Sequence, residues 1–254
     1  MSENNNMNKT AMVFGATGAV GKQLLKDVLK NGKYAKVVAV GRRPVELDES
    51  IPQDKLVQKT VDFENLEAHR EDFKNVSDVF CCLATTRADA GSADKFIKID
   101  QTYVLDSAKI IQEENKPAGS ELAPVHFLYC SSTGANKNSM FLYPKTKGQT
   151  EEKLAETGFE KVSIFRPGLL EVVEPRTHPR LLEPVAVAIC KPIFNLFGYK
   201  GVNSVDTVGK AMHKVAEDSS IKPADASSIK KSVIGSLVSA FNKNDIENIV
   251  HSKL

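Results

Sequence analysis

The sequence predicts an α/β protein with a doubly wound, mostly parallel sheet, and three observations indicate this. Short apolar runs alternate with longer amphipathic stretches along the chain, as expected when parallel strands are joined by crossover helices. A glycine-rich turn separates the first apolar run from the first amphipathic stretch. The length of 254 residues, of which 41% are hydrophobic, suits a single domain with a substantial core.

The order of the elements follows from the residue pattern. Runs rich in Val, Ile, Phe and Cys are typical of buried strands, and the stretches between them have the spacing of helices. Residues 1–9 are expected to be a disordered lead-in, and residues 169–203 an irregular region that faces the substrate. Strands are predicted over residues 11–15, 36–41, 76–84, 126–132 and 161–168, and helices over residues 21–32, 96–114, 145–158 and 205–218.

Composition and charge argue against several functions. The formal net charge is +2 and no block of like charges occurs, so no nucleic-acid partner is expected. No metal is expected either, because the five histidines lack ligand spacing and the adjacent Cys81 and Cys82 would point to opposite faces of a strand. The weakly charged residues 184–199 are too few to span a bilayer, which leaves open either peripheral membrane contact or a core or subunit-interface helix.

A glycine-rich turn follows the first predicted strand. The sequence GATGAVG begins at Gly15 and opens the first predicted helix, which is the context of a dinucleotide-binding Rossmann fold. Gly15 would permit the tight turn, Gly18 a close approach to a pyrophosphate, and Gly21 close packing of the helix on the strand. The spacing is G-x-x-G-x-x-G rather than the commoner G-x-G-x-x-G, and a plain strand-to-helix turn is the alternative.

Two arginines follow the second predicted strand. Arg42 and Arg43 stand where an NAD-selective site would place an Asp or Glu for the ribose 2′-hydroxyl. Guanidinium groups pair instead with a 2′-phosphate, so NADP(H) is the expected cofactor, and solvated surface arginines are the alternative. Asp62, at the end of the following strand, is suited either to accept a hydrogen bond from adenine or to cap its loop.

Ser132, Tyr143 and Lys147 are the predicted catalytic residues. Ser132 ends a strand at the sheet edge where open α/β folds bind ligands. Tyr143 and Lys147 are four residues apart, so they lie on one face of a helix. An ammonium beside a phenol stabilises the phenolate, which suits Tyr143 to act as acid or base on a substrate oxygen. Ser132 would bind that oxygen, and Lys147 would also reach the nicotinamide ribose.

These motifs together resemble a known family. The glycine turn, the Ser-Tyr-Lys set and the sequence RPG at residues 166–168 are similar to those of atypical short-chain dehydrogenases/reductases, over nearly the whole chain. The strings VGRRP, CCLATTRADAG, KIDQTYV and SSTGANKNSMFLYPKTKGQTEEKL resemble more specifically the Tat-interacting-protein oxidoreductase-like proteins. Within that group they resemble the fungal branch named for being found in the mitochondrial proteome.

The resemblance implies an NADP(H)-binding protein and extends the expected cofactor site. It places Leu83, Ala84 and Thr85 beside the riboses, where many relatives have an Asn-Ala-Gly motif, and the backbone of Pro167 and Gly168 against the carboxamide. Pattern and resemblance together predict these cofactor-binding residues: Gly15, Thr17, Gly18, Ala19, Val20, Gly21, Arg42, Arg43, Asp62, Leu83, Ala84, Thr85, Pro167 and Gly168.

Three functions are consistent with these residues, and the third, an isomerase or dehydratase that uses bound cofactor transiently, has no feature of its own in this chain. The first is NADPH-dependent reduction of a small carbonyl substrate, with hydride from the cofactor and a proton from Tyr143. The second is an NADPH-sensing interaction or scaffold protein with little or no catalysis. The Ser-Tyr-Lys set favours the enzyme, because a sensor needs no acid beside the nicotinamide. The resemblance also implies a peripheral protein of the mitochondrial outer membrane, with a cytoplasmic place as the alternative, and a protein partner or a homo-oligomer stays open.

Overall fold

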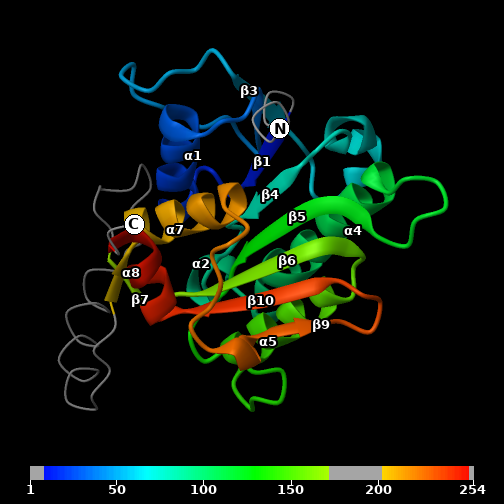
Figure 1. Ribbon diagram of the computed structural model, residues 1–254, viewed down its shortest axis with the longest axis vertical. Coiled ribbons are helices and arrows are strands. Elements are labelled where there is room, and N and C mark those ends of the chain that lie inside the picture. Colours follow the sequence, from blue (N-terminus) through cyan, green and yellow to red (C-terminus); the bar gives the residue numbers. More distant parts are fainter. Residues whose placement is uncertain (1–8, 172–201, 252–254) are drawn as a thin grey trace.

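A mostly parallel sheet of eight strands forms the centre of the protein (Figure 1). The computed structural model describes residues 9–171 and 202–251. The strand order is β3-β2-β1-β4-β5-β6-β10-β9, and β9 runs antiparallel to β10. This order confirms the predicted doubly wound α/β fold. The strands of the sheet are β1 (Thr10–Phe14), β2 (Lys36–Gly41), β3 (Leu56–Thr60), β4 (Asp78–Cys81), β5 (Ala123–Cys130), β6 (Phe159–Arg166), β9 (Ile229–Lys231) and β10 (Leu237–Asn242).

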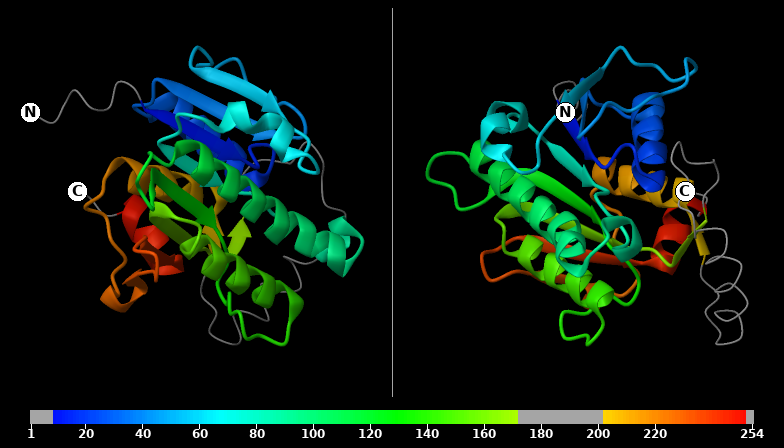
Figure 2. Two further views of the ribbon diagram at one scale, coloured as in Figure 1. Left: turned by 90° about the vertical axis from the view of Figure 1, so that its right-hand side faces the viewer. Right: turned by 180° about the vertical axis from the view of Figure 1, so that it is seen from behind.

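Helices cover both faces of the sheet (Figure 2). On one face α1 packs against α7, and α7 against α8; on the other, α4 packs against α5 and η1. Each layer buries its own apolar core against the sheet. The described helices are α1 (Ala19–Asn31), α2 (Arg87–Ala90), α3 (Ala93–Ile97), α4 (Tyr103–Asn115), α5 (Leu142–Ala155), α7 (Val205–Glu217), α8 (Lys243–His251), the 3₁₀ helices η1 (Leu66–Phe73) and η3 (Ala226–Ser228), and the π-helical turn η2 (Lys98–Thr102).

The pattern of α1 shows why the sequence folds this way. Leu24, Leu25 and Val28 are buried, whereas Lys30 is exposed. Apolar residues at this spacing form one stripe along a helix. The stripe packs into the core that α1 shares with α7 and the sheet.

Three parts of the chain differ from the sequence-based expectation. The single helix predicted over residues 96–114 consists of α3, η2 and α4. Both ends of the predicted irregular region are strands, because β7 (Leu169–Glu171) pairs in parallel with β8 (Val202–Ser204). Beyond residue 218, where no element was predicted, the structure has η3, β9, β10 and α8. Residues 1–8 of the expected lead-in, and the weakly charged residues 184–199, lie outside the described residues.

The carboxyl ends of β1, β4, β5 and β6 meet at one edge of the sheet. These four strands are adjacent and parallel. The chain leaves β1 toward β2 on one side, while β4 lies on the other side of β1. This is the topological switch point at which open α/β sheets bind ligands.

Candidate functional site

The turn from β1 into α1 is packed so closely that it requires glycine. Gly15 has a φ of +75°, a left-handed conformation that favours glycine. A Cβ added at Gly15 would lie 2.5 Å from the carbonyl oxygen of Cys82, and one at Gly21 would overlap the carbonyl oxygen of Gly15. The turn therefore lies directly against the end of β4 and the first turn of α1.

The amino end of α1 presents backbone donors beside this turn. Gly18 is the N-cap residue, and no side chain caps the helix. The first amides of a helix, here those of Ala19, Val20 and Gly21, have no acceptor within the helix, and the helix dipole adds a positive potential. Thr17 is exposed at the same place. This cradle fits a pyrophosphate, the ligand predicted from the glycine spacing.

The residues predicted to bind the adenosine lie at the ends of β2 and β3. Arg42 and Arg43 follow β2, and both are exposed. Neither guanidinium has an ion-pair partner among the described residues. Asp62 follows β3, and its Oδ1 accepts a hydrogen bond from the Glu64 N–H at 2.9 Å. The loop-capping role of Asp62 is therefore present in the structure, and its contact with adenine stays a prediction.

Tyr143 and Lys147 lie one turn apart in the first half of α5. Their exposures differ greatly, at 45% for Tyr143 and 1% for Lys147. The Tyr143 ring packs against the buried Phe96, with ring centroids 5.9 Å apart. Within the described residues, the phenol is thus accessible from outside while the ammonium is sealed in the interior.

Buried partners hold the ammonium of Lys147. Its Nζ lies 3.0 Å from Oδ1 of Asp100 and donates a hydrogen bond to the Tyr129 hydroxyl at 3.1 Å. Burial opposes the charge, but the electrostatic effects of Tyr129, Asp100 and Tyr143 outweigh burial and raise the pKa of Lys147 well above its ordinary value. Lys147 is therefore positively charged at neutral pH, one helical turn from Tyr143.

Asp100 also connects Lys147 to the loop after β4. Its Oδ2 accepts a hydrogen bond from the Thr85 N–H at 2.7 Å, and its side chain is completely buried. Thr85 follows Leu83 and Ala84, the residues expected beside the riboses. Asp100 thus joins the predicted cofactor loop to the predicted catalytic lysine.

Asp100 was not among the residues predicted from the sequence, although a pattern around it indicates a buried charge. Phe96, Asp100 and Val104 follow one another at intervals of four residues. Such residues share one face of a helix, and all three are buried in the structure. A charged residue within an apolar stripe indicates a buried partner, because lone charges are almost never fully buried.

Pro167 and Gly168 lie at the same edge but have partners within the protein. The Pro167 carbonyl accepts a hydrogen bond from the Thr133 N–H at 2.8 Å. The Gly168 N–H donates to Oδ1 of the buried Asn203, also at 2.8 Å. The first bond ties the start of β7 to the loop after β5 and the second ties it to β8. The expected contact of both residues with a carboxamide stays a prediction.

The two adjacent serines at the end of β5 differ in their contacts. Ser131 donates a hydrogen bond from Oγ to Oε1 of Glu151 at 2.6 Å, and Arg166 binds the same carboxylate through two nitrogens. The Ser132 Oγ is buried and has no hydrogen-bond partner among the described residues. Buried hydroxyl groups normally have one, so Ser132 is the serine whose hydroxyl is available to a ligand.

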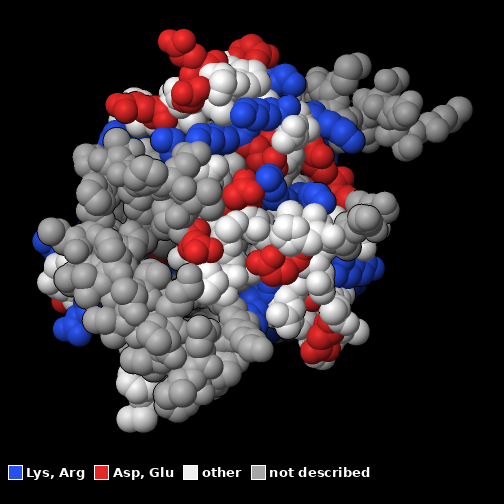
Figure 3. Space-filling view, turned by 90° about the vertical axis from the view of Figure 1, so that its left-hand side faces the viewer, with Lys and Arg blue, Asp and Glu red and all other residues white. Residues whose placement is uncertain are grey.

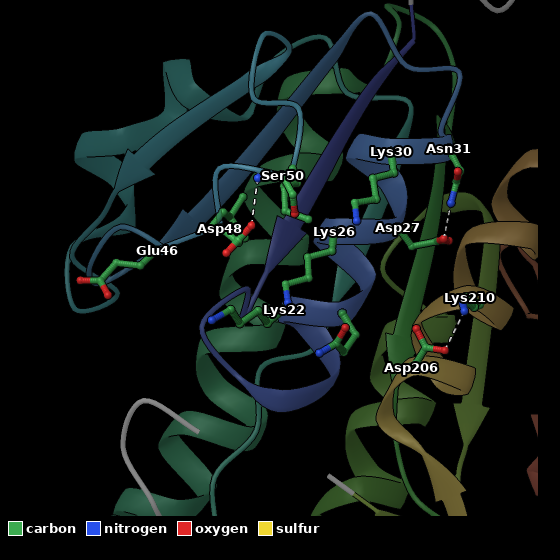
Figure 4. A pocket seen from close by; sticks show the side chains of 13 residues that line it. Lys22, Lys26, Asp27, Lys30, Asn31, Glu46, Asp48, Ser50, Asp206 and Lys210 are labelled. Atoms are coloured by element: carbon green, nitrogen blue, oxygen red, sulfur yellow. Dashed lines mark hydrogen bonds and ion pairs between the residues drawn. The ribbon is translucent and has the colours of Figure 1, made fainter. Parts of the chain in front are cut away.

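A groove of about 760 Å³ lies elsewhere, between α1, the loop after β2 and the start of α7 (Figure 4). Lys22, Lys26 and Lys30 of α1 line it, with Asp48 and Ser50 on the facing loop. Basic and acidic side chains are mixed on this side of the molecule (Figure 3). Because none of the predicted catalytic side chains lines the groove, we do not assign it to the reacting centre.

Metal-binding and membrane-spanning features were sought in the described ranges. No group of three or more His, Cys, Asp or Glu side chains in residues 9–171 and 202–251 is arranged to hold a metal ion. Within the same part of the chain, no helix has both the length and the apolar character needed to cross a membrane.

Comparison with known proteins places these features in a family. Residues 15–186 match the model of the NAD(P)H-binding family. The matching segment runs from the glycine turn through the Ser-Tyr-Lys set to the end of β7 and beyond. The chain belongs to the NAD(P)H-binding family. A nicotinamide cofactor and the corresponding oxidoreductase-type fold are thereby confirmed.

Two relatives are similar to this chain in sequence, and one solved structure is similar to it in fold. Protein HTATIP2 of Rattus norvegicus is 41% identical over 172 residues, which are 68% of this chain and 67% of that protein. Protein FMP52, mitochondrial, of Debaryomyces hansenii is 39% identical over 164 residues, which are 63% of this chain and 66% of that protein. The resemblance inferred from the local strings is confirmed, and each alignment spans about two thirds of the relative. A short-chain dehydrogenase from Streptomyces avermitilis has the same fold, with a TM-score of 0.61 and 15% identity over 98% of this chain and 92% of that chain.

Proposed function

We propose that this chain is an NADPH-dependent reductase of carbonyl compounds, with Tyr143 as the proton donor. The observation that carries the proposal is the buried, charged Lys147, which Asp100 holds one helical turn from an accessible tyrosine. Sealing an ammonium in the interior costs several kcal/mol unless a partner compensates it. Asp100 compensates the charge of Lys147, and a cation kept this close to a phenol is suited to stabilising phenolate.

The residues present fit the cofactor. The turn at Gly15 and the uncapped amino end of α1 would hold its pyrophosphate. Arg42 and Arg43 would hold a 2′-phosphate, because both are exposed, neither has an ion-pair partner among the described residues, and no carboxylate stands at their position. We therefore propose NADP(H) rather than NAD(H).

Each predicted catalytic residue has a separate role. Tyr143 gives the proton of its hydroxyl to the carbonyl oxygen of the substrate and becomes a phenolate. Lys147 stabilises that phenolate electrostatically, and Ser132 donates a hydrogen bond to the same substrate oxygen. When bound, the reduced cofactor supplies the hydride that the carbonyl carbon accepts. The product is the alcohol, and Tyr143 regains a proton from solvent.

The test is NADPH oxidation by the purified chain with a panel of aldehydes, ketones and quinones. Tyr143→Phe is expected to lower kcat by roughly 10²–10⁴-fold, the usual contribution of a general acid. Tyr34→Phe is the matched control, because Tyr34 is buried in the core and precedes the amino end of β2, at the edge of the sheet opposite to the predicted catalytic residues. This control should keep wild-type kcat.

Two outcomes would contradict the proposed reductase. Equal activity of wild type and Tyr143→Phe would remove Tyr143 from the mechanism. Tight NADPH binding without turnover of any carbonyl in the panel would point instead to the NADPH-sensing interaction protein.

We also propose that the protein is a peripheral protein of the mitochondrial outer membrane. The support is the similarity to a relative named as mitochondrial and the resemblance of the local strings to the same fungal branch. The tagged full chain should sediment with mitochondria, be degraded by protease added to intact mitochondria, and be released by alkaline carbonate. Two results would contradict this location. One is recovery of the tagged chain only in the cytosolic fraction, and the other is resistance of the chain to added protease until the inner membrane is opened.

A further inference from the structure

Cys82 and Cys130 lie opposite one another at the carboxyl ends of two neighbouring strands. The register of β4 and β5 pairs Cys81 with Tyr129, so the next residue of each strand is Cys82 and Cys130. Cys130 belongs to the core beneath α1 and α7, and Cys82 packs against the same core. Cys81 and Tyr129 belong to the core on the other face. This alternation along the strands puts Cys82 and Cys130 on one face of the sheet.

The spacing of neighbouring strands is compatible with a disulfide between the two positions. Adjacent strands lie about 4.7–4.9 Å apart, and disulfides join residues whose Cα atoms are about 4.4–6.8 Å apart. Cys82 and Cys130 both have free thiols, and the two side chains are close enough for each to shift the pKa of the other. Cys82 is only half-buried, so among the described residues the pair is not sealed from solvent.

The same contact makes one thiol more acidic than the other. The neighbouring Cys82 thiol lowers the pKa of Cys130, and the positive charge of Lys147 acts in the same direction against the effect of burial. The neighbouring Cys130 thiol and burial together raise the pKa of Cys82. An acidified thiol beside a second thiol is the arrangement found in redox-sensitive pairs.

We propose that Cys82 and Cys130 are a redox modification site, forming a reversible disulfide when the protein meets a hydroperoxide, and that the disulfide weakens dinucleotide binding. The inference rests on membership of the NAD(P)H-binding family and does not depend on carbonyl reduction. It assigns a function to two cysteines that the proposed reductase does not use.

The chemical step is balanced with the hydroperoxide as the oxidant. The Cys130 thiolate attacks the peroxide, so that an S–O bond forms, the O–O bond breaks, and the departing hydroxide takes the proton of the Cys82 thiol to give water. The Cys82 thiolate then attacks the Cys130 sulfur, so that the S–S bond forms and the S–O bond breaks. The second hydroxide gains a proton from solvent. Two thiols are oxidised and one hydrogen peroxide is reduced to two waters.

The position of Cys82 explains why the disulfide would affect the cofactor. Its carbonyl oxygen lies so close to Gly15 that an added Cβ there would be 2.5 Å away. The loop that follows Cys82 leads to Thr85, whose amide is bonded to Asp100, the partner of Lys147. A new covalent bond at Cys82 therefore acts on both the phosphate turn and the charge network of the site.

Peptide mapping tests the site itself. The full chain is treated with hydrogen peroxide, alkylated, digested with trypsin without reduction, and analysed by mass spectrometry. We expect the tryptic peptide 75–87 joined to peptide 110–137, with the loss of two hydrogens and reversal by dithiothreitol. Since peptide 75–87 contains both Cys81 and Cys82, the variants decide which residue is joined: Cys81→Ser should keep the cross-link and Cys82→Ser should lose it.

Titration of NADPH into the reduced and oxidised full chain tests the effect. Oxidation should raise the NADPH Kd by about tenfold, which corresponds to about 1.4 kcal/mol, and dithiothreitol should restore it. In Cys130→Ser, whose folding is checked by circular dichroism, peroxide should leave the Kd unchanged. By linkage, saturating NADPH should shift the thiol–disulfide equilibrium of wild type toward the reduced form, measured in a redox buffer of dithiothreitol.

Several results would overturn the proposal. A cross-link to Cys190 or between chains, or sulfinic acid in place of a cross-link, would remove the modification site. A Cys82–Cys130 disulfide with an unchanged NADPH Kd would refute its effect on the cofactor. Both results are independent of Tyr143, so they are distinguishable from a failure of the proposed reductase.

Discussion

The Nζ of Lys147 lies 3.0 Å from Oδ1 of Asp100, and the two side chains are 1% and 0% exposed. Removing one member of a buried ion pair leaves the other charge uncompensated, which costs roughly 3–5 kcal/mol. We expect this loss in the free energy of unfolding, measured in urea, for Asp100→Asn. Asparagine keeps an oxygen for the Thr85 amide, so the effect reports the charge. NADPH oxidation should fall in the same variant, because the lysine network changes.

A double-mutant cycle checks that the pair acts as a unit. Lys147→Met should also be destabilising, and Asp100→Asn combined with Lys147→Met should cost less than the sum of the single changes. Additive losses would show that Asp100 and Lys147 do not interact energetically.

We expect substitution of the two adjacent serines to have different effects, on activity for Ser132 and on stability for Ser131. Ser132→Ala removes a hydroxyl that has no partner in the described structure, so stability should stay within about 0.5 kcal/mol of wild type, while kcat falls. Ser131→Ala removes the hydrogen bond to the buried Glu151 and should cost about 1–3 kcal/mol of unfolding free energy. Thermal unfolding and NADPH oxidation measured on both variants decide this. A loss of activity confined to Ser131→Ala would reverse the assignment.

Gly15 and Gly119 form a matched pair for testing the phosphate turn. Both have positive φ, +75° and +80°, so alanine at either position costs roughly 1–2 kcal/mol of backbone strain. Only the Cβ at Gly15 meets backbone atoms of Cys82, whereas nothing lies within 4 Å at Gly119. Gly15→Ala should therefore abolish NADPH binding in calorimetry, and Gly119→Ala should bind like wild type. Equal affinities would argue against the turn as the phosphate cradle.

Arg42 is expected to make the protein bind NADPH more tightly than NADH. A hydrogen bond to a charged group contributes about 1.5–3 kcal/mol, so Arg42→Ala should weaken NADPH binding by roughly 10–100-fold. NADH binding should change little, because NADH lacks the 2′-phosphate. Arg87→Ala is the control, since Arg87 is also exposed but lies in α2, after β4. Similar losses for NADPH and NADH in Arg42→Ala would contradict the assignment to NADP(H).

Local sequence patterns were sufficient for the features that depend on neighbouring residues. The glycine turn, strands β1, β2, β4, β5 and β6 of the sheet and the one-turn separation of Tyr143 and Lys147 all arise from short spacings. Asp100 was not identified because its partner Lys147 comes from a different helix and meets it only in the folded protein. A second reason is that the sequence predicted one regular helix over residues 96–114. In the structure Asp100 lies in the π-helical turn η2 within that range, and such irregular turns often mark functional sites.

The carboxyl-terminal part of the sheet was unpredictable for a related reason. β10 pairs in parallel with β6, which lies far from it in the chain, and the apolar run of β10 is interrupted by Ser239. A short segment of this kind gains its strand conformation from the neighbouring strand more than from its own residues. The irregular region predicted over residues 169–203 likewise begins and ends in strands because β7 and β8 meet one another.

His213 joins α7 to α1 and is expected to make stability depend on pH. Its Nδ1 lies 2.7 Å from Oδ2 of Asp27, and its Nε2 lies 3.3 Å from Oε1 of Glu217. Burial opposes protonation, but both carboxylates outweigh burial and raise the pKa of His213 above 6.5. Its contribution is therefore fully present below pH 6.5 and is lost as pH rises through the folded-state pKa. Asp27, whose pKa is lowered because His213 and Asn31 outweigh burial, stays charged across that range.

Urea unfolding from about pH 5 to about pH 9 tests this ionic contact. At the acidic end, His213→Gln should be less stable than wild type by roughly 1.5–3 kcal/mol, as for a lost hydrogen bond to a charged group, and the difference should shrink as pH rises. Burial raises the pKa of Asp78 to about 6, so both proteins should share some loss of stability as pH rises from about 5 through about 6. His126→Gln is the control, because burial lowers the pKa of His126 to about 3 and this histidine stays neutral throughout. Its curve should run parallel to that of wild type, and a parallel curve for His213→Gln would show that His213 does not change charge in this range.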